Sequence, residues 1–431
     1  MYYRLQNYCK LVEGAKRGAI YNLQTGKVHS INQGALGLLT ACRAKALEEL
    51  LDFKSPQDQI FLDFLHRLTE MGLGSFFINQ PSPTKKEATP PVNPPKLEFI
   101  WLELTSSCNN QCLHCYATSG PTSCSDLVDH KRWLELITEA RTAGASAIQL
   151  IGGEPLLYRG WRELIEKAYH EKYDFIEIFT NATLINDDDI TFFKHYNVNI
   201  ATTIYADNAA VHDSITLNEG SFTKTFTAIN KLLASGIPLR IASIIMKPNE
   251  YEVEHIMKLC ANLGVEVTPP DVVRPTGRGE DDALLPTAYA KQPIKPPFYT
   301  DPISFAKAQC QHSCLSGKIA ITASGDVIPC IFARSEICGN ILQTPLAEVL
   351  NGPLLSDCWH TTKDKIEKCQ HCEYRYACTD CRPLAQGSDT KKRWLACSSE
   401  CSYNPYTGEW KDGTLCETIV NSIIPSGSTQ K

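Results

Sequence analysis

Apolar runs and stretches with helical spacing alternate along the chain from Phe99 onward. The apolar runs predict six strands, at residues 99–105, 147–151, 175–181, 199–206, 238–246 and 265–269. The intervening stretches predict helices near residues 126–143, 160–171, 187–196, 221–235 and 250–263. Repeated strand–helix units form a parallel sheet with right-handed crossovers. Six units cannot close an eight-stranded barrel, so we expect an open α/β partial barrel, (β/α)6, with its chemistry in the loops after the strands.

The first 80 residues follow a different pattern. Residues 18–23 and 27–31 predict two strands around a turn, residues 33–42 and 55–71 predict helices, and residues 75–78 predict a closing strand. This order suggests a small winged-helix-like α+β domain. Winged helices commonly bind DNA, but nine Lys or Arg against seven Asp or Glu give this stretch too little positive charge for convincing phosphate binding.

Composition changes mark the domain boundaries. Six prolines fall between residues 81 and 95, so residues 81–97 are interpreted as a linker between the first domain and the barrel. The barrel is then expected at residues 98–276. Residues 277–309 form a loop-rich bridge, and residues 310–431 form a last, cysteine-rich unit.

The overall composition limits the functional classes. The 431 residues are 43% hydrophobic and 21% charged, as in an ordinary soluble globular protein, and the net charge of −6 favours neither nucleic acid nor an anionic membrane as partner. No apolar stretch is long enough to span a bilayer, and no signal peptide is visible, so we expect a cytoplasmic protein. Since cytosolic thiols are kept reduced, nineteen cysteines indicate metal rather than disulfides.

Three cysteines follow the first barrel strand with the spacing Cys108-x3-Cys112-x2-Cys115. Three thiolates on one loop can hold three irons of a [4Fe–4S] cube and leave the fourth iron open to a substrate, because such clusters normally take four thiolates. The alternative is a structural zinc loop, which needs a fourth ligand. His114 lies inside the spacer and Cys124 is more distant, so neither completes a zinc site well.

With Tyr116 beside the last cysteine, this spacing resembles the radical S-adenosylmethionine (SAM) superfamily. The resemblance implies that the open iron binds the amino and carboxylate groups of SAM, whose one-electron cleavage gives a 5′-deoxyadenosyl radical. It also implies that the loop after the second strand, Gly152-Gly153-Glu154-Pro155, holds the SAM amino group, since two glycines let backbone approach a ligand closely.

Two further positions belong to this predicted site by resemblance. Asn181 ends the third strand, and Thr203, near the end of the fourth strand, stands where relatives usually have Ser and would contact the ribose or carboxylate of SAM. Alternatively, Asn181 is an ordinary turn residue and Thr203 provides an ordinary hydroxyl in the sheet. Arg274 and Arg278 follow the sixth strand and could face substrate or SAM, or lie in a solvated loop. No residue is assigned as a catalytic acid or base.

Eleven cysteines lie between residues 310 and 401. Two C-x2-C pairs among them, at 369/372 and 378/381, also suit a zinc knuckle. The array, with Gly325-x4-Cys330 after a predicted hairpin at residues 318–329, resembles the SPASM extension of radical SAM peptide maturases, which houses two auxiliary [4Fe–4S] clusters. The resemblance assigns cluster I to Cys310, Cys314, Cys330 and Cys381. It assigns cluster II to Cys369, Cys372, Cys378 and Cys397.

Some cysteines depart from this pattern. The step from Cys378 to Cys381 is one residue short of the family spacing, and the distal ligand could be Cys401 instead of Cys397. Cys338 and Cys358 are unassigned and could be alternate ligands. The remaining cysteines are expected to be plain buried apolar residues: Cys9, Cys42, Cys260 and Cys416.

The order of domains is typical of maturases of ribosomally synthesised and post-translationally modified peptides. The resemblance implies that residues 1–80 bind the leader of a precursor peptide by strand addition. It further implies an electron donor such as flavodoxin or ferredoxin and, as product, a thioether or carbon–carbon crosslink. Alternatives are a radical epimerase, decarboxylase or excision enzyme, an anaerobic sulfatase-maturing type of oxidase, and a metal-dependent winged-helix regulator. The sulfatase-maturing type has an Asp after the cysteine that matches Cys330, and this chain has Ile331.

Overall fold

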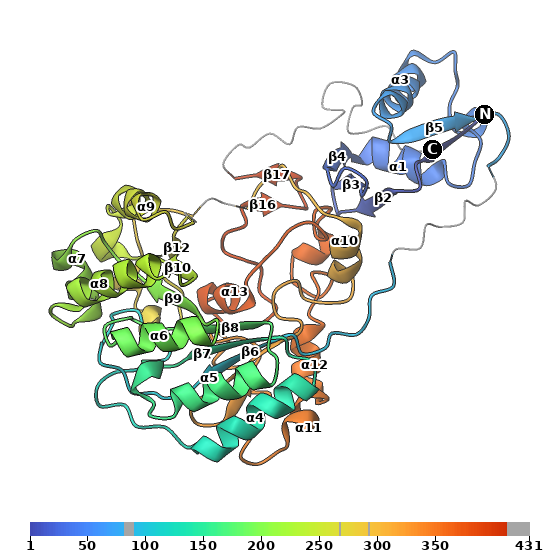
Figure 1. Ribbon diagram of the computed structural model, residues 1–431. Helices are drawn as coiled ribbons and strands as arrows, with labels where there is room; N and C mark the ends of the chain where they lie inside the picture. The colour runs from blue at the N-terminus through green and yellow to red at the C-terminus, as the bar shows by residue number, and fades with distance from the viewer. Residues whose placement is uncertain (82–89, 267–268, 292–293, 412–431) are drawn as a thin grey trace.

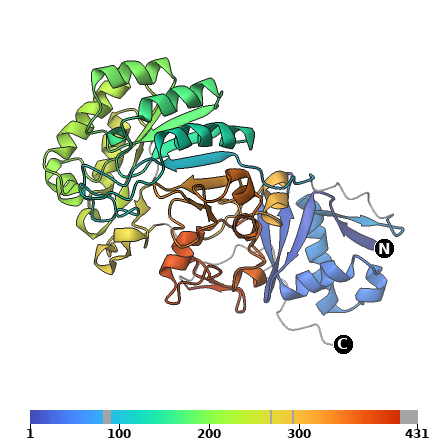
Figure 2. The same ribbon diagram turned by 90° about the horizontal axis from the view of Figure 1, so that it is seen from below.

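A computed structural model describes residues 1–81, 90–266, 269–291 and 294–411 (Figure 1). Part of the predicted linker, at 82–89, and Cys416 lie outside the described residues. Three regions follow one another in space. In both views, the orange and red C-terminal segments lie between the blue N-terminal domain and the green barrel (Figures 1 and 2).

The barrel is built on five parallel strands that are neighbours in one sheet, in the order β10-β9-β8-β7-β6. Their bounds are β6 Phe99–Glu103, β7 Ala147–Ile151, β8 Phe175–Phe179, β9 Asn199–Thr203 and β10 Leu239–Ala242. Trp101 pairs with Gln149, Gln149 with Glu177, and Glu177 with Asn199, so the strands are aligned across the sheet. Their carboxyl ends therefore meet at one edge, as the sequence predicts.

The crossover helices cover the outer face of this sheet, with α4, α5 and α6 side by side (Figure 1). The helices are α4 His130–Thr142, α5 Trp161–His170, α6 Asp187–His195, α7 Ala209–Thr216, α8 Ser221–Ala234 and α9 Val253–Asn262. All five predicted helices are confirmed, and α7 was not predicted. Trp133 of α4 and Leu164 of α5 are fully buried in the core between helices and sheet. Side-chain caps fix the helix starts: Asp129 accepts from the Arg132 N–H, and Asn186 from the Asp188 and Asp189 N–H groups.

The sixth barrel strand lies further along the chain than predicted. Strand β12, Asp271–Val272, pairs in parallel with β11, Ile244–Ile245, whereas the described part of 265–269 is not a strand. Pro269 and Pro270 lack the N–H that a ladder requires, so pairing can begin only after them. The apolar character of Val265 has another origin, because it is buried against α9 beside Ile256.

The barrel sheet continues into the C-terminal unit. Strand β13, Lys318–Ile321, pairs in parallel with β6 and forms the predicted hairpin with β14, Asp326–Ile328; β15, Gly339–Asn340, follows. Gly325 turns the hairpin with a φ of +87°, which suits glycine. The other elements of this unit are α10 Pro302–Ala308, α11 Leu346–Leu350, α12 Pro353–Trp359, α13 Arg382–Ser388, β16 Tyr403–Asn404 and β17 Glu409–Trp410. Short 3₁₀ helices occur at Pro155–Leu157, Lys247–Asn249, Gly277–Glu280, Asp282–Leu284 and Cys369–His371.

The N-terminal domain contains the predicted strands and helices together with two strands and one helix that were not predicted. A three-stranded sheet, β2-β3-β4, and a two-stranded sheet, β1-β5, pack with the helices around a core that includes Ile20, Leu65 and Leu68. The elements are β1 Tyr2–Leu5, β2 Cys9–Glu13, β3 Arg17–Asn22, β4 Val28–Asn32, α1 Gln33–Ala41, α2 Leu47–Leu50, α3 Pro56–Glu70 and β5 Gly74–Phe77.

This domain docks directly on the cysteine-rich unit. Tyr21 of β3 is fully buried in a cluster that includes Phe298, Tyr374 and Trp410, and its hydroxyl donates to the carbonyl of Glu373 over 2.8 Å. An apolar interface of this kind holds two domains in one relative position. In the described ranges, none of the helices is both long and apolar enough to cross a membrane.

Candidate active site

A cavity of about 590 Å³ runs through the barrel interior, from Phe99 and Phe175 at the starts of β6 and β8 to the loops at the carboxyl ends of the strands. Its wall includes most of the residues predicted for the SAM site: Cys108, Cys112, Cys115, Tyr116, Gly152, Gly153, Asn181 and Thr203. Arg274 and Arg278 also line it, and so do Ile331 and Phe332 of the cysteine-rich unit. The cavity thus extends from the cysteine loop to the segment that follows Cys330.

The loop that carries Cys108, Cys112 and Cys115, called the cysteine loop below, is anchored by neighbouring loops and by α7. The N–H groups of Gln111 and Leu113 donate to the carbonyls of Thr216 and Ile215 over 2.9 and 3.0 Å. From the other side, Arg278 donates from Nε to the Cys112 carbonyl and from Nη2 to the Ser119 carbonyl, both over 2.8 Å. Arg278 therefore orders the loop and is not a free cation for substrate.

The three thiols meet at the cavity with some support from N–H donors. The Asn110 N–H lies 3.4 Å from Cys108 Sγ, and the Ser119 N–H lies 3.4 Å from Cys115 Sγ. Burial raises the pKa of the Cys108 thiol to about 11. A metal ligand must be a thiolate, so binding of a cluster here would release the proton of this thiol.

The glycine loop packs directly on the cysteine loop. Gly153 N–H donates to the Thr105 carbonyl over 2.7 Å, and Glu154 N–H donates to the Ser107 carbonyl over 2.8 Å. Gly152 has a φ of +136°, and a Cβ there would lie 2.5 Å from the Thr105 oxygen. Glycine is therefore required at this position both for its conformation and for its size.

The carboxylate of Glu154 organises the third strand end. Its side chain is fully buried, and it accepts from Thr180 Oγ1 over 2.7 Å, from the Asn181 N–H over 2.8 Å and from the Leu156 N–H over 3.0 Å. Burial raises the pKa of Glu154 to about 7. Pro155 is buried beside it. Glu154 and Pro155 thus lie behind the cavity wall, and the carboxylate positions the backbone of Asn181.

The remaining predicted SAM-site residues face the cavity from separate loops. Asn181 Nδ2 donates to Asn109 Oδ1 over 2.8 Å and lies 3.9 Å from Cys108 Sγ. Thr203 is half-buried at the end of β9. Tyr116 packs edge-on against Phe332, with ring centroids 5.2 Å apart. Asn181, Thr203, Tyr116 and the three cysteines therefore line the same cavity.

Sequence reasoning missed several cavity residues. Tyr205 is buried, and its hydroxyl bonds His114 Nε2 over 2.8 Å, beneath the cysteine loop. Glu177 of β8 is buried in the wall and accepts from Arg240 Nη2 over 2.8 Å. A charged residue inside an apolar strand run is a signal that could have identified Glu177, since buried carboxylates are normally paired.

The first predicted group of auxiliary ligands is partly assembled. The thiols of Cys314, Cys330 and Cys381 interact electrostatically, and Arg274 Nη1 donates to Cys381 Sγ over 2.8 Å. Cys310 is not part of this group in the structure. It is exposed, and its Sγ lies 3.6 Å from the carbonyl oxygens of Ala306 and Lys307 at the end of α10.

The second predicted group has its four thiols together with that of Cys401, the alternative ligand. Cys369 Sγ and Cys397 Sγ lie 3.9 Å apart, and Cys401 hydrogen-bonds to Cys397. The thiols of Cys372 and Cys378 interact electrostatically with Cys369. Cys397 and Cys401 are thus both at this group, so the choice between them stays open.

Comparison with known proteins identifies the two cysteine-bearing regions. Residues 102–260 match the model of the radical SAM superfamily, and residues 310–373 match that of the SPASM iron–sulfur cluster-binding domain. The chain therefore contains a radical SAM domain followed by a SPASM domain. It is a SPASM-type radical SAM enzyme, and its domains carry a SAM-binding [4Fe–4S] cluster and auxiliary clusters.

Relatives with known names extend the comparison. The subtilosin biosynthesis protein AlbA of Bacillus subtilis is 27% identical over 316 residues, which cover 69% of each chain. The sporulation killing factor maturation protein SkfB of Bacillus subtilis is 31% identical over 165 residues, which cover 38% of this chain and 39% of SkfB. The crystal structure of Streptococcus suis SuiB bound to its precursor peptide SuiA matches with a TM-score of 0.53 over 93% of this chain and 100% of SuiB. At 14% identity, the SuiB match shows a shared fold.

The radical SAM cavity fits its cofactors. Three thiols converge at one wall, and the Gly152–Gly153 backbone forms an adjoining wall where a Cβ would collide with the cysteine loop. This donor set suits an iron–sulfur cluster with an open iron better than it suits zinc, which takes four ligands in structural sites. The individual auxiliary ligands stay predictions.

The unassigned cysteines lie away from the cavity. Cys338 and Cys358 hydrogen-bond to each other within the apolar core of the barrel and SPASM hairpin, and neither lines the cavity. Cys9, Cys42 and Cys260 are buried apolar residues, as predicted.

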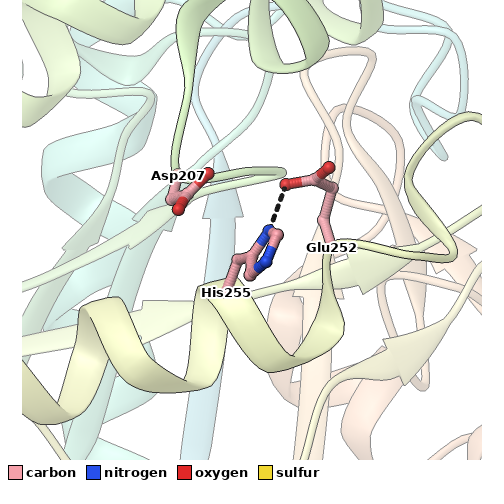
Figure 3. A group of neighbouring side chains, drawn as sticks. All are labelled: Asp207, Glu252 and His255. Carbon is pink, nitrogen blue, oxygen red and sulfur yellow. Dashed lines mark hydrogen bonds and ion pairs between the residues drawn. The ribbon is translucent and has the colours of Figure 1, made fainter.

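A further group of polar side chains lies outside the radical SAM cavity (Figure 3). Asp207 follows β9, and Glu252 and His255 lie at the start of α9; one ligand atom from each falls within 4.8 Å of the others. His255 Nδ1 lies 3.4 Å from Glu252 Oε2, which also accepts from Asn208. Asp207 and His255 are exposed, so this group is a surface cluster in which His255 and Glu252 bind each other.

Proposed function

We propose that this radical SAM enzyme installs a thioether or carbon–carbon crosslink in a ribosomally made precursor peptide. One observation carries the proposal: a single cavity joins the SAM-site residues with Arg274, Ile331 and Phe332, beside the auxiliary cysteines. The names of AlbA and SkfB refer to bacteriocin biosynthesis and killing-factor maturation, and SuiB was crystallised with a precursor peptide. These relatives support a peptide as the substrate.

The residues of the cavity have separate tasks in this proposal. Cys108, Cys112 and Cys115 would hold the open cluster, and the backbone of Gly152 and Gly153 would bind the amino group of SAM. When bound, SAM and the clusters supply hydrogen-atom abstraction and one-electron transfer, so that the peptide loses two hydrogens in total. Asn181 and Thr203 orient SAM from the neighbouring strand ends. Tyr116 packs on Phe332 and thereby closes the wall toward the SPASM domain.

The remainder of the cavity suits part of a peptide. Aromatic rings of Phe99, Trp101 and Phe179 line its inner part along β6 and β8 and give it an apolar surface. The Glu177–Arg240 pair supplies polar groups in the same wall. An external one-electron donor such as flavodoxin or ferredoxin, in the cytoplasm, completes the proposed system.

We place the leader of the precursor peptide on the N-terminal domain, as an added strand. Strand β2 has β3 on one side, and its Glu13 carbonyl points to the other side, where it accepts from Arg375 over 2.7 Å. Because bonding directions alternate along an antiparallel strand, the N–H and C=O of Leu11 point to the same outer side. This edge can therefore receive an extended peptide.

The leader proposal can be tested with a labelled precursor peptide and the full-length protein. Leu11→Pro removes an outward N–H and leaves the ladder with β3 intact, so it should weaken binding in fluorescence anisotropy by about tenfold or more. Leu11→Ala keeps this N–H and serves as the matched control, which should bind the peptide as the wild type does. Unchanged binding in Leu11→Pro would exclude strand addition, and salt-sensitive binding of duplex DNA would favour a regulator.

The alternative activities have less structural support. A radical epimerase needs a hydrogen donor in the cavity, commonly a cysteine, but Cys338 and Cys358 lie in the apolar core instead. A sulfatase-maturing type needs a base after Cys330, and the apolar Ile331 lines the cavity at that position. These placements favour crosslinking.

The reaction is tested with SAM, a strong reductant and a precursor peptide encoded by a neighbouring open reading frame. The enzyme should release 5′-deoxyadenosine and leave the peptide about two mass units lighter, because a crosslink removes two hydrogens. Peptide mass spectrometry is carried out in ordinary and in deuterated water. A peptide whose mass is unchanged in ordinary water and about one unit higher in deuterated water would show epimerisation and would exclude crosslinking.

A further inference from the structure

Arg274 connects the radical SAM cavity with the first auxiliary cysteine group. It follows β12, and its Nη1 donates to Cys381 Sγ over 2.8 Å while its Nη2 donates to Asp271 Oδ2 over 3.2 Å. The same side chain lines the cavity near Phe332. A single guanidinium therefore contacts both the space proposed for substrate and a predicted cluster ligand.

The position of this guanidinium is tightly fixed. It lies 4.6 Å from the ring centroid of Phe332, and only 20% of the Arg274 side chain is exposed. Its backbone is packed as well, since a Cβ on Gly279 would lie 2.3 Å from the Arg274 carbonyl oxygen. On the other side, a Cβ on Gly387 of α13 would lie 2.7 Å from the Pro275 oxygen. The charge is thus held beside the sulfur.

A fixed cation has a defined effect on an iron–sulfur cluster. Reduction adds one negative charge to the cluster, and hydrogen bonds to its sulfurs stabilise the reduced form. An arginine keeps its proton in proteins, so its charge persists at every working pH. Because the side chain is largely buried, water and salt screen this charge only weakly.

We propose that Arg274 is a positioning residue that raises the reduction potential of the auxiliary cluster held in part by Cys330 and Cys381. The proposal rests on the proposed function and on the assignment of these two cysteines as ligands. The other auxiliary group interacts with a different buried cation, Lys363, through Cys369 and Cys378. A change at Arg274 should therefore affect one auxiliary cluster and leave the other as it is.

The test is a redox titration followed by electron paramagnetic resonance, in the absence of SAM and peptide. It uses the anaerobically reconstituted full-length protein with Cys108, Cys112 and Cys115 replaced by Ala, so that only auxiliary clusters contribute. Arg274→Gln should shift one midpoint potential to a more negative value. Arg274→Lys keeps a charge without the planar fork and should give a smaller shift in the same direction.

A matched control separates this effect from general changes in cavity charge. Arg240→Gln removes a cation from the same cavity, where Arg240 binds Glu177 rather than a sulfur, and both potentials should stay as in the parent protein. Equal potentials in Arg274→Gln and its parent would overturn the proposal. If Arg274→Gln fails to retain iron, Arg274→Lys is titrated instead, and an unchanged potential in that variant overturns the proposal as well. The peptide mass assay on the wild-type enzyme tests the proposed function separately.

Discussion

Gly153 offers a sharp test of the contact between the glycine loop and the cysteine loop. A Cβ at this position would lie 2.1 Å from the Ser107 carbonyl oxygen and 2.6 Å from the Ser107 carbonyl carbon, whereas ordinary van der Waals contact begins at 3.4 Å. Both atoms belong to backbone, which cannot rotate away as a flexible side chain can. In Gly153→Ala, the two loops must therefore separate by about 1 Å.

This displacement has two measurable consequences. Overpacking of a tight contact destabilises a protein by about 1–3 kcal/mol, which should appear in the free energy of unfolding. A displacement of about 1 Å between groups that must be aligned for a reaction costs about 100-fold in rate. We therefore expect Gly153→Ala to bind SAM more weakly and to release 5′-deoxyadenosine about 100-fold more slowly than the wild type.

The assays are anaerobic calorimetry of SAM binding and chromatographic detection of 5′-deoxyadenosine, each normalised to iron content. The control is Gly236→Ala, because Gly236 has a φ of +69° but a Cβ there would meet nothing within 4 Å. This control should lose about 1 kcal/mol of stability from backbone strain and keep its activity. Wild-type stability and turnover in Gly153→Ala would refute the inference that the two loops must touch.

Three further outcomes are expected. Replacement of Cys108, Cys112 and Cys115 by Ala should remove about a third of the iron from fully reconstituted protein and abolish 5′-deoxyadenosine release, whereas stoichiometric zinc would contradict the cluster assignment. Arg382→Leu should destabilise the protein by about 3–5 kcal/mol in urea unfolding, because this fully buried guanidinium binds Asp380 and two carbonyls. Three or more residues inserted between leader and modified residue should lower crosslinking in a mass assay, since each extends the peptide by about 3.3 Å.

Local pattern was sufficient to predict most of the barrel. The five β strands from Phe99 to Ala242 are mainly apolar, because parallel strands with helices outside are buried on both faces, and polar residues such as Gln149, Glu177 and Arg240 line the cavity inside the barrel. The short helix α7 was missed, since Ala209–Thr216 has only two turns and its buried face includes the polar residues His212 and Thr216 beside Ile215. Its importance comes from tertiary contacts, because the carbonyls at its end accept from the cysteine loop.

The candidate site was predictable where chemistry depends on spacing along the chain. Cys108, Cys112 and Cys115 share one loop, so their spacing alone brings them together. Residues that meet only through the fold gave a weaker signal: the bond between Arg274 and Cys381 spans 107 positions. Cys310 matches the family order, but its Sγ lies 3.6 Å from two carbonyl oxygens at the end of its own helix, so its role as a ligand stays a prediction. A contact such as that between Arg274 and Cys381 depends on how one domain packs on another, and no local sequence pattern predicts this packing.

The docking of the first domain connects leader recognition with the cluster region. Its sheet contributes Tyr21 to the apolar cluster that also contains Tyr374 and Trp410, with Cys372 and Cys378 packed against it. The Tyr21 hydroxyl donates to the carbonyl of Glu373, the residue after Cys372. A protein without the first 80 residues would expose these large rings and would lose a hydrogen bond beside a predicted ligand. The N-terminal domain is therefore part of the support of the SPASM region and not merely a module on a proline-rich linker.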